Sequence, residues 1–205
     1  MKGADAFLSF LRERRSVRRF CSKPVPQKLL AQLVEWATWA PSAGNRQDWF
    51  FTVITSATVR REMAEAVRRR WDAIIAANRG SGVIEEVERY VEHFGDFALA
   101  PAVIVVSARA PDSVQRHLLG DAAEATTGSA ASAAMAAQNL MLAAHALGLG
   151  SCCMTGALAA RDELKRILGL SKRQEIVCLI AVGWPDEKPV PPPRKPVSEI
   201  GRFVE

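Results

Sequence analysis

An alanine-rich stretch at residues 122–147 places the tightest limit on how this chain folds. The stretch is long enough to cross a membrane, but polar side chains flank or interrupt it at Asp121, Glu124, Asn139 and His145. Alanine on many sides of a helix lets other helices, or a partner subunit, approach closely. The stretch therefore predicts one helix buried inside the protein and argues against a membrane span.

The composition favours a single globular domain over residues 1–205. The chain has 205 residues, 49% of them hydrophobic and 24% charged, and its mean hydropathy is near zero. A net charge of +5 would permit nucleic-acid binding. There is no zinc-finger spacing, aromatic-rich RNA-binding signature or lysine-rich tail, so a small anionic ligand is favoured over nucleic acid.

The cysteines and the first residues limit the site chemistry and the compartment. Cys21, Cys152, Cys153 and Cys178 form no CxxC and do not combine with the three histidines at metal-ligand spacing, so no metal site is expected. The adjacent pair at 152 and 153 is expected to fill the core. Residues 1–11 lack the pattern of a secretory signal, which favours a cytoplasmic protein.

Runs typical of strands alternate with helical patterns along the chain. β-branched and aromatic residues predict strands at 49–54, 102–107 and 175–182, and small residues at 151–156 are consistent with a strand end. Apolar residues at helical spacing predict helices at 5–11, 26–39, 58–77, 83–94 and 161–168. These elements predict an α/β or α+β domain in which helices cover a sheet. Repeated prolines between Pro189 and Pro196 predict an extended C-terminal arm, 185–205, that lies across another surface.

An arginine cluster occupies residues 12–19, where five arginines surround the hydroxyl of Ser16. A planar guanidinium matches a phosphate or carboxylate, so the cluster indicates an anion site; a solvated basic face is the alternative. Two further stretches, 41–49 and 148–156, combine turn-forming residues with backbone amides next to predicted strands. Each is either a ligand-binding edge or a connector built from ordinary turn residues.

Self-sufficient catalytic motifs are missing from the sequence. It contains no G-x-S-x-G, H-E-x-x-H or G-x-x-x-x-G-K-[ST] pattern, and no G-x-G-x-x-G after a strand. An enzyme built from these residues needs chemistry supplied by a bound cofactor. The arginine cluster together with a polar loop suits a phosphorylated cofactor.

Three stretches together resemble the signature motifs of the FMN-dependent nitroreductase family, in the family's order and spacing. They are residues 14–20 (RRSVRRF), 40–49 (APSAGNRQDW) and 143–152 (AAHALGLGSC). The resemblance implies an α+β fold with a central mixed β-sheet flanked by helices. It also implies a homodimer with one FMN in each of two interface clefts, and a C-terminal arm, 185–205, exchanged with the partner subunit.

The resemblance also assigns cofactor contacts, residue by residue. Arg14, Arg15, Ser16 and Arg18 would bind the phosphate, ribityl chain and pyrimidine edge of the flavin. Thr155 and Gly156 would offer backbone amides near its N5 atom, and Arg194 is the candidate for a second phosphate arginine. The loop residues that would face the ring from the other subunit are Pro41, Ser42, Ala43 and Asn45.

The implied chemistry is a hydride transfer from NADH or NADPH to flavin N5, followed by reduction of a nitroaromatic, quinone or similar small oxidant, with no side chain required as a catalytic acid or base. Other flavin chemistry on the same fold, such as reductive dehalogenation or flavin breakdown, and a non-catalytic flavin-binding protein remain alternatives. The sequence departs from the family at Asp48, where proline usually follows the glutamine. Residues 58–94 fall in the family's variable region near the pocket, so the substrate does not transfer.

Overall fold

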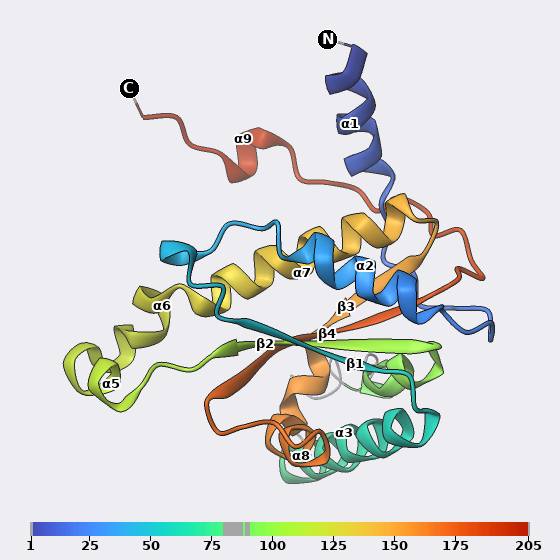
Figure 1. Cartoon of the computed structure of the whole chain (residues 1–205). Coiled ribbons are helices and arrows are strands. Elements are labelled where there is room, and N and C mark those ends of the chain that lie inside the picture. The colour runs from blue at the N-terminus through green and yellow to red at the C-terminus, as the bar shows by residue number, and fades with distance from the viewer. Residues whose placement is uncertain (1, 80–87, 89–90, 205) are drawn as a thin grey trace.

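A four-stranded sheet forms the centre of the molecule in the computed structural model, which describes residues 2–79, 88 and 91–204. The strand order is β1-β2-β4-β3, and every neighbouring pair is antiparallel (Figure 1). The only parallel pairing among the described residues is a single bridge between Ser16 and Ser151. The strands are β1 (Trp49–Ile54), β2 (Ala102–Arg109), β3 (Gly150–Met154) and β4 (Gln174–Gly183).

Helices cover both faces of this sheet, which confirms the expected α+β fold. The helices α2 (Gln27–Ala37) and α7 (Ser129–Ala146) pack on one face, and α3 (Ala57–Ala77) and α8 (Arg161–Ile167) lie on the other (Figure 1). The apolar run of β2 serves both layers. Ile104 and Val106 belong to the cluster under α7, whereas Val103 and Val105 belong to the cluster above α3.

The alanine-rich stretch is two helices rather than the single helix that its composition predicts. The short helix α6 (Ala123–Thr127) ends at Gly128, which has a φ of +64°, and α7 begins at the next residue. A Cβ at Gly128 would lie 3.2 Å from the Cβ of Ala43. Glycine therefore serves both the left-handed turn and the close approach of the loop around residue 43. The alanine face of α7 is buried as expected.

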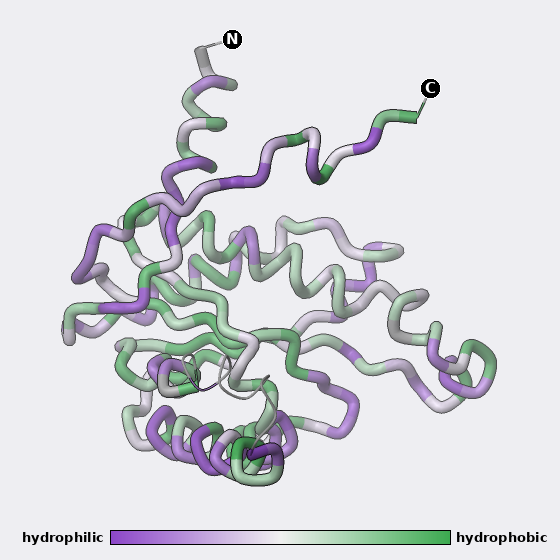
Figure 2. Tube along the Cα trace, turned by 180° about the vertical axis from the view of Figure 1, so that it is seen from behind, coloured by the Kyte–Doolittle hydropathy of each residue, from purple (hydrophilic) through white to green (hydrophobic). Residues whose placement is uncertain are grey.

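Both termini extend beyond the globular body. Helix α1 (Lys2–Glu13) and the segment after Pro185 project on the same side as α2 and α7 (Figures 1 and 2). The C-terminal segment is mostly extended, as its prolines predict, but a four-residue helix, α9 (Val197–Ile200), interrupts it. Phe7 and Phe203 are 57% and 85% exposed. One copy of the chain thus leaves apolar side chains on both termini uncovered.

The remaining elements connect the sheet and the helices that cover it. The helix α5 (Ser113–Leu119) and the turn η3 (Gly120–Ala122) connect β2 to α6. Three further 3₁₀ segments are η1 (Ala43–Asn45), η2 (Glu92–Leu99) and η4 (Gly156–Ala160). The helix expected at 83–94 lies largely outside the described residues. None of the described helices is both long and apolar enough to span a membrane.

Candidate functional site

The first motif runs along the exposed edge of β3. The backbone N–H of Val17 donates to the carbonyl of Ser151 at 3.0 Å, beside the parallel bridge between Ser16 and Ser151. A Cβ at Gly150 would lie only 2.7 Å from Cγ1 of Val17. The glycine that ends the GLG run of the third motif therefore lets the first motif approach the strand. In this way the structure brings the first and third motifs together.

The start of the C-terminal arm fastens the other end of the first motif. The N–H of Cys21 donates to the carbonyl of Trp184 at 2.9 Å. The carboxylate of Glu187 accepts the backbone N–H groups of Arg18 at 2.5 Å and Arg19 at 3.0 Å. Burial alone would raise the pKa of Glu187, but these N–H groups and the two guanidinium charges hold it below its ordinary value. The arginine backbone is thereby fixed.

Arg14 carries an unsatisfied donor in this cluster. Its Nη1 atom is buried and has no hydrogen-bond partner within the part of the chain that the structure describes. By contrast, Nη1 of Arg15 donates to the carbonyls of Arg12 and Arg14. A buried unpaired guanidinium nitrogen is costly, so Arg14 is suited to an anionic or carbonyl ligand.

The residue of α7 that lies near Arg14 is His145, and its charge state bears on this cluster. His145, in the last turn of α7, stacks against Phe10 with ring centroids 4.8 Å apart. Burial lowers the pKa of His145, and the charges of Arg14 and Arg15 lower it further, against an opposing contribution from Glu13. A neutral imidazole therefore lies near the arginine cluster at neutral pH.

A cavity of about 440 Å³ opens beside this edge. Thr155 and Gly156 form part of its wall, together with Arg18 from the first motif. Aromatic side chains crowd this wall: a Cβ at Gly156 would lie 2.5 Å from the Phe94 ring, and Nε1 of Trp71 donates to the carbonyl of Gly156 at 2.9 Å. The other lining residues are Phe20, His93, Phe94, Asp96, Phe97, Cys152, Cys153, Met154 and Ala181.

The adjacent cysteines do not both fill the core as expected. Cys152 is buried, but Cys153 is exposed because side chains alternate along β3 and this strand lies at the edge of the sheet. A hydrogen bond from Cys178, together with the charge of Arg14, lowers the pKa of the Cys153 thiol to about 7. The same interaction, together with burial, raises the pKa of Cys178. No group of acidic, histidine or cysteine side chains in the described ranges is arranged to hold a metal ion.

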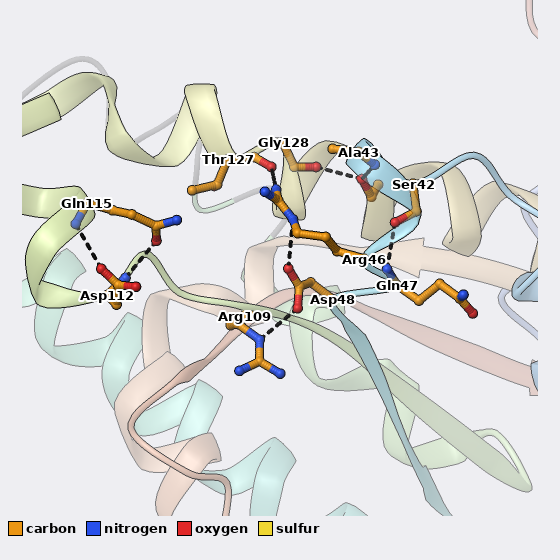
Figure 3. A network of polar contacts seen from close by, with 11 residues as sticks. Ser42, Ala43, Arg46, Gln47, Asp48, Arg109, Asp112, Gln115, Thr127 and Gly128 are labelled. Carbon is orange, nitrogen blue, oxygen red and sulfur yellow. Dashed lines mark hydrogen bonds and ion pairs between the residues drawn. The ribbon is translucent and has the colours of Figure 1, made fainter.

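The second motif forms a tightly bonded loop at the opposite end of α7 (Figure 3). The Oγ of Ser42 accepts the N–H of Gln47 at 2.7 Å, and the N–H of Ala43 donates to Oγ of Ser132 at 3.2 Å. Asn45 and Gln47 have φ values of +51° and +52°. Pro41, Ala43 and Asn45 remain exposed on this loop.

Asp48 takes part in ion pairing where the family usually has proline. Its two carboxylate oxygens lie 3.2 Å from Nε of Arg46 and 2.7 Å from Nε of Arg109 (Figure 3). The guanidinium of Arg46 also donates to the carbonyl of Thr127. The backbone carbonyl of Asp48 accepts the N–H of Arg109 at 2.9 Å. Asp48 thus ties the loop to β2.

The loop and the arginine cluster lie far apart within one chain. Ser132, which contacts the loop, and His145, near Arg14, are 13 residues apart on α7. At 1.5 Å per residue this separation is about 20 Å. Arg194 is exposed on the arm and forms no hydrogen bond or ion pair with the described residues. One chain therefore brings Arg18, Thr155 and Gly156 to one cavity wall and continues the first motif along β3, whereas the second motif lies at the other end of α7.

Three residues at this site escaped sequence reasoning. Glu187 looks like one acidic residue in a proline-rich tail, and Trp71 and Phe94 look like core residues of separate helices. Both aromatic residues lie within 58–94, the region expected near the pocket, but the sequence did not single them out there; helical spacing only placed Trp71 on the apolar face of its helix. The contacts of the three residues with Arg18 and Gly156 depend on how distant segments pack.

The sequence profile described as the Nitroreductase family matches residues 11–184. The chain belongs to this family. Among curated relatives, an NADH dehydrogenase from Thermus thermophilus is 30% identical over 92% of this chain and 91% of its own length. An iodotyrosine dehalogenase 1 homolog from Caenorhabditis elegans is 27% identical over 99% of this chain, which spans 62% of that protein.

Solved structures agree with the family assignment. A BluB-like flavoprotein from Clostridium difficile superposes with a TM-score of 0.84 at 25% identity, covering 97% of this chain and 99% of that one. A nitroreductase with bound FMN from Desulfitobacterium hafniense has a TM-score of 0.71 at 23% identity, covering 97% of each chain. The expected nitroreductase fold is therefore confirmed.

Proposed function

We propose that this protein is an FMN-dependent oxidoreductase that takes electrons from NADH or NADPH and passes them to a small oxidant such as a nitroaromatic or quinone. The observation that carries the proposal is the buried, unpaired Nη1 of Arg14, which lies in the same motif as Ser16, bridged to β3, and Arg18, which lines a cavity with an aromatic wall. This nitrogen needs an acceptor, and a flavin phosphate or pyrimidine carbonyl provides one. Family membership and the flavin-containing structural neighbours support the same cofactor.

The chain's own residues have distinct parts in this proposal. The flavin, when bound, supplies the electron-transfer chemistry. Arg14, Arg15, Ser16 and Arg18 bind its phosphate, ribityl chain and pyrimidine edge, with a second phosphate contact from Arg194. The backbone amides of Thr155 and Gly156 hold the edge of the ring. The aromatic wall of the cavity keeps water away and leaves space for a planar substrate, which suits catalysis by positioning.

A homodimer completes the proposed site. The distance of about 20 Å between Ser132 and His145 along α7 supports a second copy as the source of the second motif. In this arrangement Pro41, Ser42, Ala43 and Asn45 of one subunit cover the flavin held by the arginines of the other. The exposed apolar side chains of α1 and of the arm, among them Phe7 and Phe203, also suit burial against a partner subunit.

Mixed dimers test this division of the site. One chain carries Arg14→Ala, and a differently tagged chain carries Ser42→Ala with Asn45→Ala. If each site takes its arginines and its loop from different subunits, the mixed dimer has one intact site, and purified protein contains about half the wild-type FMN. Both parent homodimers contain much less. Failure of the mixed dimer to regain FMN, with its mass confirmed by sedimentation, would contradict the shared site.

Reductive dehalogenation is the second candidate, favoured by the similarity to an iodotyrosine dehalogenase homolog over nearly the whole chain. The two candidates share the flavin site and differ in the oxidant. Anaerobic reduction of the purified flavoprotein by NADH or NADPH, followed by mixing with a quinone, a nitroaromatic or 3-iodotyrosine, separates them. Rapid reoxidation by a quinone or nitroaromatic supports the first, and iodide release supports the second. A flavin that neither nicotinamide reduces indicates a non-catalytic binding protein.

A further inference from the structure

A second cavity lies at the N-terminus of α7, at the opposite end of this helix from the arginine cluster of the first motif. Its volume is about 480 Å³, and an adjoining cavity of about 250 Å³ shares Arg109, Ala110, Thr127 and Ser129 with it. We call the two together the α7 N-terminal cavity. The arginines that line it are Arg46, Arg109, Arg116, Arg161 and Arg173.

The start of α7 gives this cavity a positive end. The helix has 18 residues, and the residue before it, Gly128, has no side chain with which to cap it. Ser132 is the first residue whose N–H donates to the carbonyl of Gly128, at 2.9 Å. The backbone N–H groups in the first turn of a helix have no acceptor within that helix. They are therefore available to another acceptor, and the helix dipole favours an anion at this end.

Ser129 provides an independent sign of a ligand. It is only 5% exposed, it lines both parts of the cavity, and its hydroxyl makes no hydrogen bond with the residues that the structure describes. Its oxygen is not one of the fully enclosed unpaired atoms, so it is reached from the cavity. By contrast, the Oγ of Ser132, one turn later, both donates to Gly128 and accepts from Ala43. The hydroxyl of Ser129 is therefore available at the helix terminus.

More arginines than carboxylates line the cavity. Five arginines face three carboxylates, and all three carboxylates have other partners. Asp48 binds two arginines, Asp112 caps α5 by accepting the N–H of Gln115, and Glu175 binds Lys165 at 2.9 Å. Arg116 and Arg173 form no ion pair within the described residues, and Arg161 has only Asp162, 3.9 Å away and 94% exposed.

We propose that the α7 N-terminal cavity binds an oxyanion of the phosphate class. The start of α7 and the Ser129 hydroxyl donate hydrogen bonds, and Arg116 and Arg161 supply charge. The arrangement suits a tetrahedral oxyanion because several donors converge from separate elements. This site goes beyond the proposed flavin function and does not depend on it. The phosphate group comes either from free phosphate or from a phosphorylated nucleotide such as NADP.

The test uses the flavin-loaded protein, in which the proposed flavin phosphate contacts are occupied. Inorganic phosphate is titrated at constant ionic strength, adjusted with sodium chloride, and binding is measured by calorimetry and by the shift in Tm. We expect saturable binding to the wild type and at least tenfold weaker binding to Arg116→Gln and Arg161→Gln. Ser129→Asp, which puts a carboxylate at the helix N-terminus, should abolish binding and raise the Tm without phosphate. Arg61→Gln, an exposed change on α3, is the matched control.

The outcomes separate the sources and allow the proposal to fail. Competition by NADP⁺ but not by NAD⁺ identifies the 2′-phosphate of a dinucleotide as the bound group, whereas competition by neither identifies free phosphate. Absence of saturable phosphate binding overturns the proposal, because NADP⁺ binding alone is also expected at the flavin of the proposed active site. Phosphate binding that Arg116→Gln, Arg161→Gln and Ser129→Asp all leave unchanged overturns it as well. Retention of FMN in these variants keeps the result separate from the flavin site.

Discussion

Two arginine-rich regions at opposite ends of α7 differ in how their charges are satisfied. At the C-terminal end, Arg14 buries a guanidinium nitrogen that no described residue accepts. At the N-terminal end, Arg46 and Arg109 share the carboxylate of Asp48, and Arg46 also donates to Thr127 (Figure 3). Both regions are rich in arginine, and they differ in whether a carboxylate of the same chain accepts hydrogen bonds from the guanidinium groups. An arginine with an internal carboxylate partner supports the fold, whereas a buried one without a partner indicates a ligand.

The strongest test of this comparison removes one arginine from each region. Arg14→Ala should weaken FMN binding by about 100-fold, because it removes charge-assisted hydrogen bonds worth about 1.5–3 kcal/mol each. Arg109→Ala should change FMN affinity by less than about threefold, since its partner is Asp48. Titration of apoprotein with FMN, followed by flavin fluorescence, measures both. Exposed Arg12→Ala is the control for net charge, and equal losses in Arg14→Ala and Arg109→Ala would break the comparison.

Substitution of Gly150 tests whether the arginine cluster depends on close packing against β3. An added methyl group at Gly150 would lie 2.7 Å from Cγ1 of Val17, so Gly150→Ala should lower the free energy of unfolding by about 1–3 kcal/mol. FMN affinity should fall as well. Urea unfolding at fixed protein concentration measures the first effect. Gly3→Ala is the control, because nothing lies within 4 Å of its added Cβ; equal stability of the two variants would show that the first motif tolerates displacement.

Removal of the Asp48 carboxylate tests the paired arginines at the N-terminal end of α7. Asp48→Ala should lower the free energy of unfolding by about 1 kcal/mol, because both guanidinium partners are about half exposed and can regain water. It should also strengthen phosphate binding in the α7 N-terminal cavity, since Arg109 loses its carboxylate. Urea unfolding and phosphate titration measure the two effects. Asp72→Ala, an exposed change on α3 at a residue that does not line this cavity, should alter neither by as much.

Glu187 gives the smallest expected effect, which depends on pH. Because the folded-state pKa of Glu187 is lowered, its carboxylate stabilises the fold above the ordinary glutamate pKa of 4.5, and this contribution is lost as the pH falls through the folded-state value. Glu187→Gln should therefore destabilise the protein at pH 7, by less than Asp48→Ala does. The difference from the wild type should shrink as the solution becomes more acidic. A pH-independent difference in urea unfolding would contradict a role for the charge.

Local patterns predicted the elements more reliably than their contacts. The strands at 49–54 and 102–107 and the helix beginning near residue 58 appear nearly where their periodicity indicates, because side-chain alternation and helical spacing are local properties. The break at Gly128 was missed because glycine in an alanine-rich run is compatible with a continuous helix. Its positive φ is tied to the approach of Ala43, 85 residues earlier in the sequence.

In the candidate site, too, the motifs were predictable from the sequence, whereas most contacts between distant segments were not. The first and third motifs were expected to contribute to one site, and the bridge between Ser16 and Ser151 brings them together. The roles of Glu187 and Trp71 were not predictable, because their contacts join segments separated by 169 and 85 residues. Asp48 was recognised as a departure from the family, but its ion pair with Arg109 depends on the pairing of β1 with β2, whereas Arg46 is a neighbour in the same loop.

The sequence by itself determined most of the strands and helices, but not the break at Gly128, and it determined the three motifs and the arginine-rich character of residues 12–19. Only the tertiary structure decided that Arg14 has an unsatisfied buried nitrogen while Arg46 and Arg109 share a carboxylate. It also decided that the second motif lies about 20 Å from the first along α7. The physical reason is that helical and strand patterns arise from neighbouring residues. Burial and ion pairing, in contrast, depend on which distant side chains the packed sheet and helices bring together.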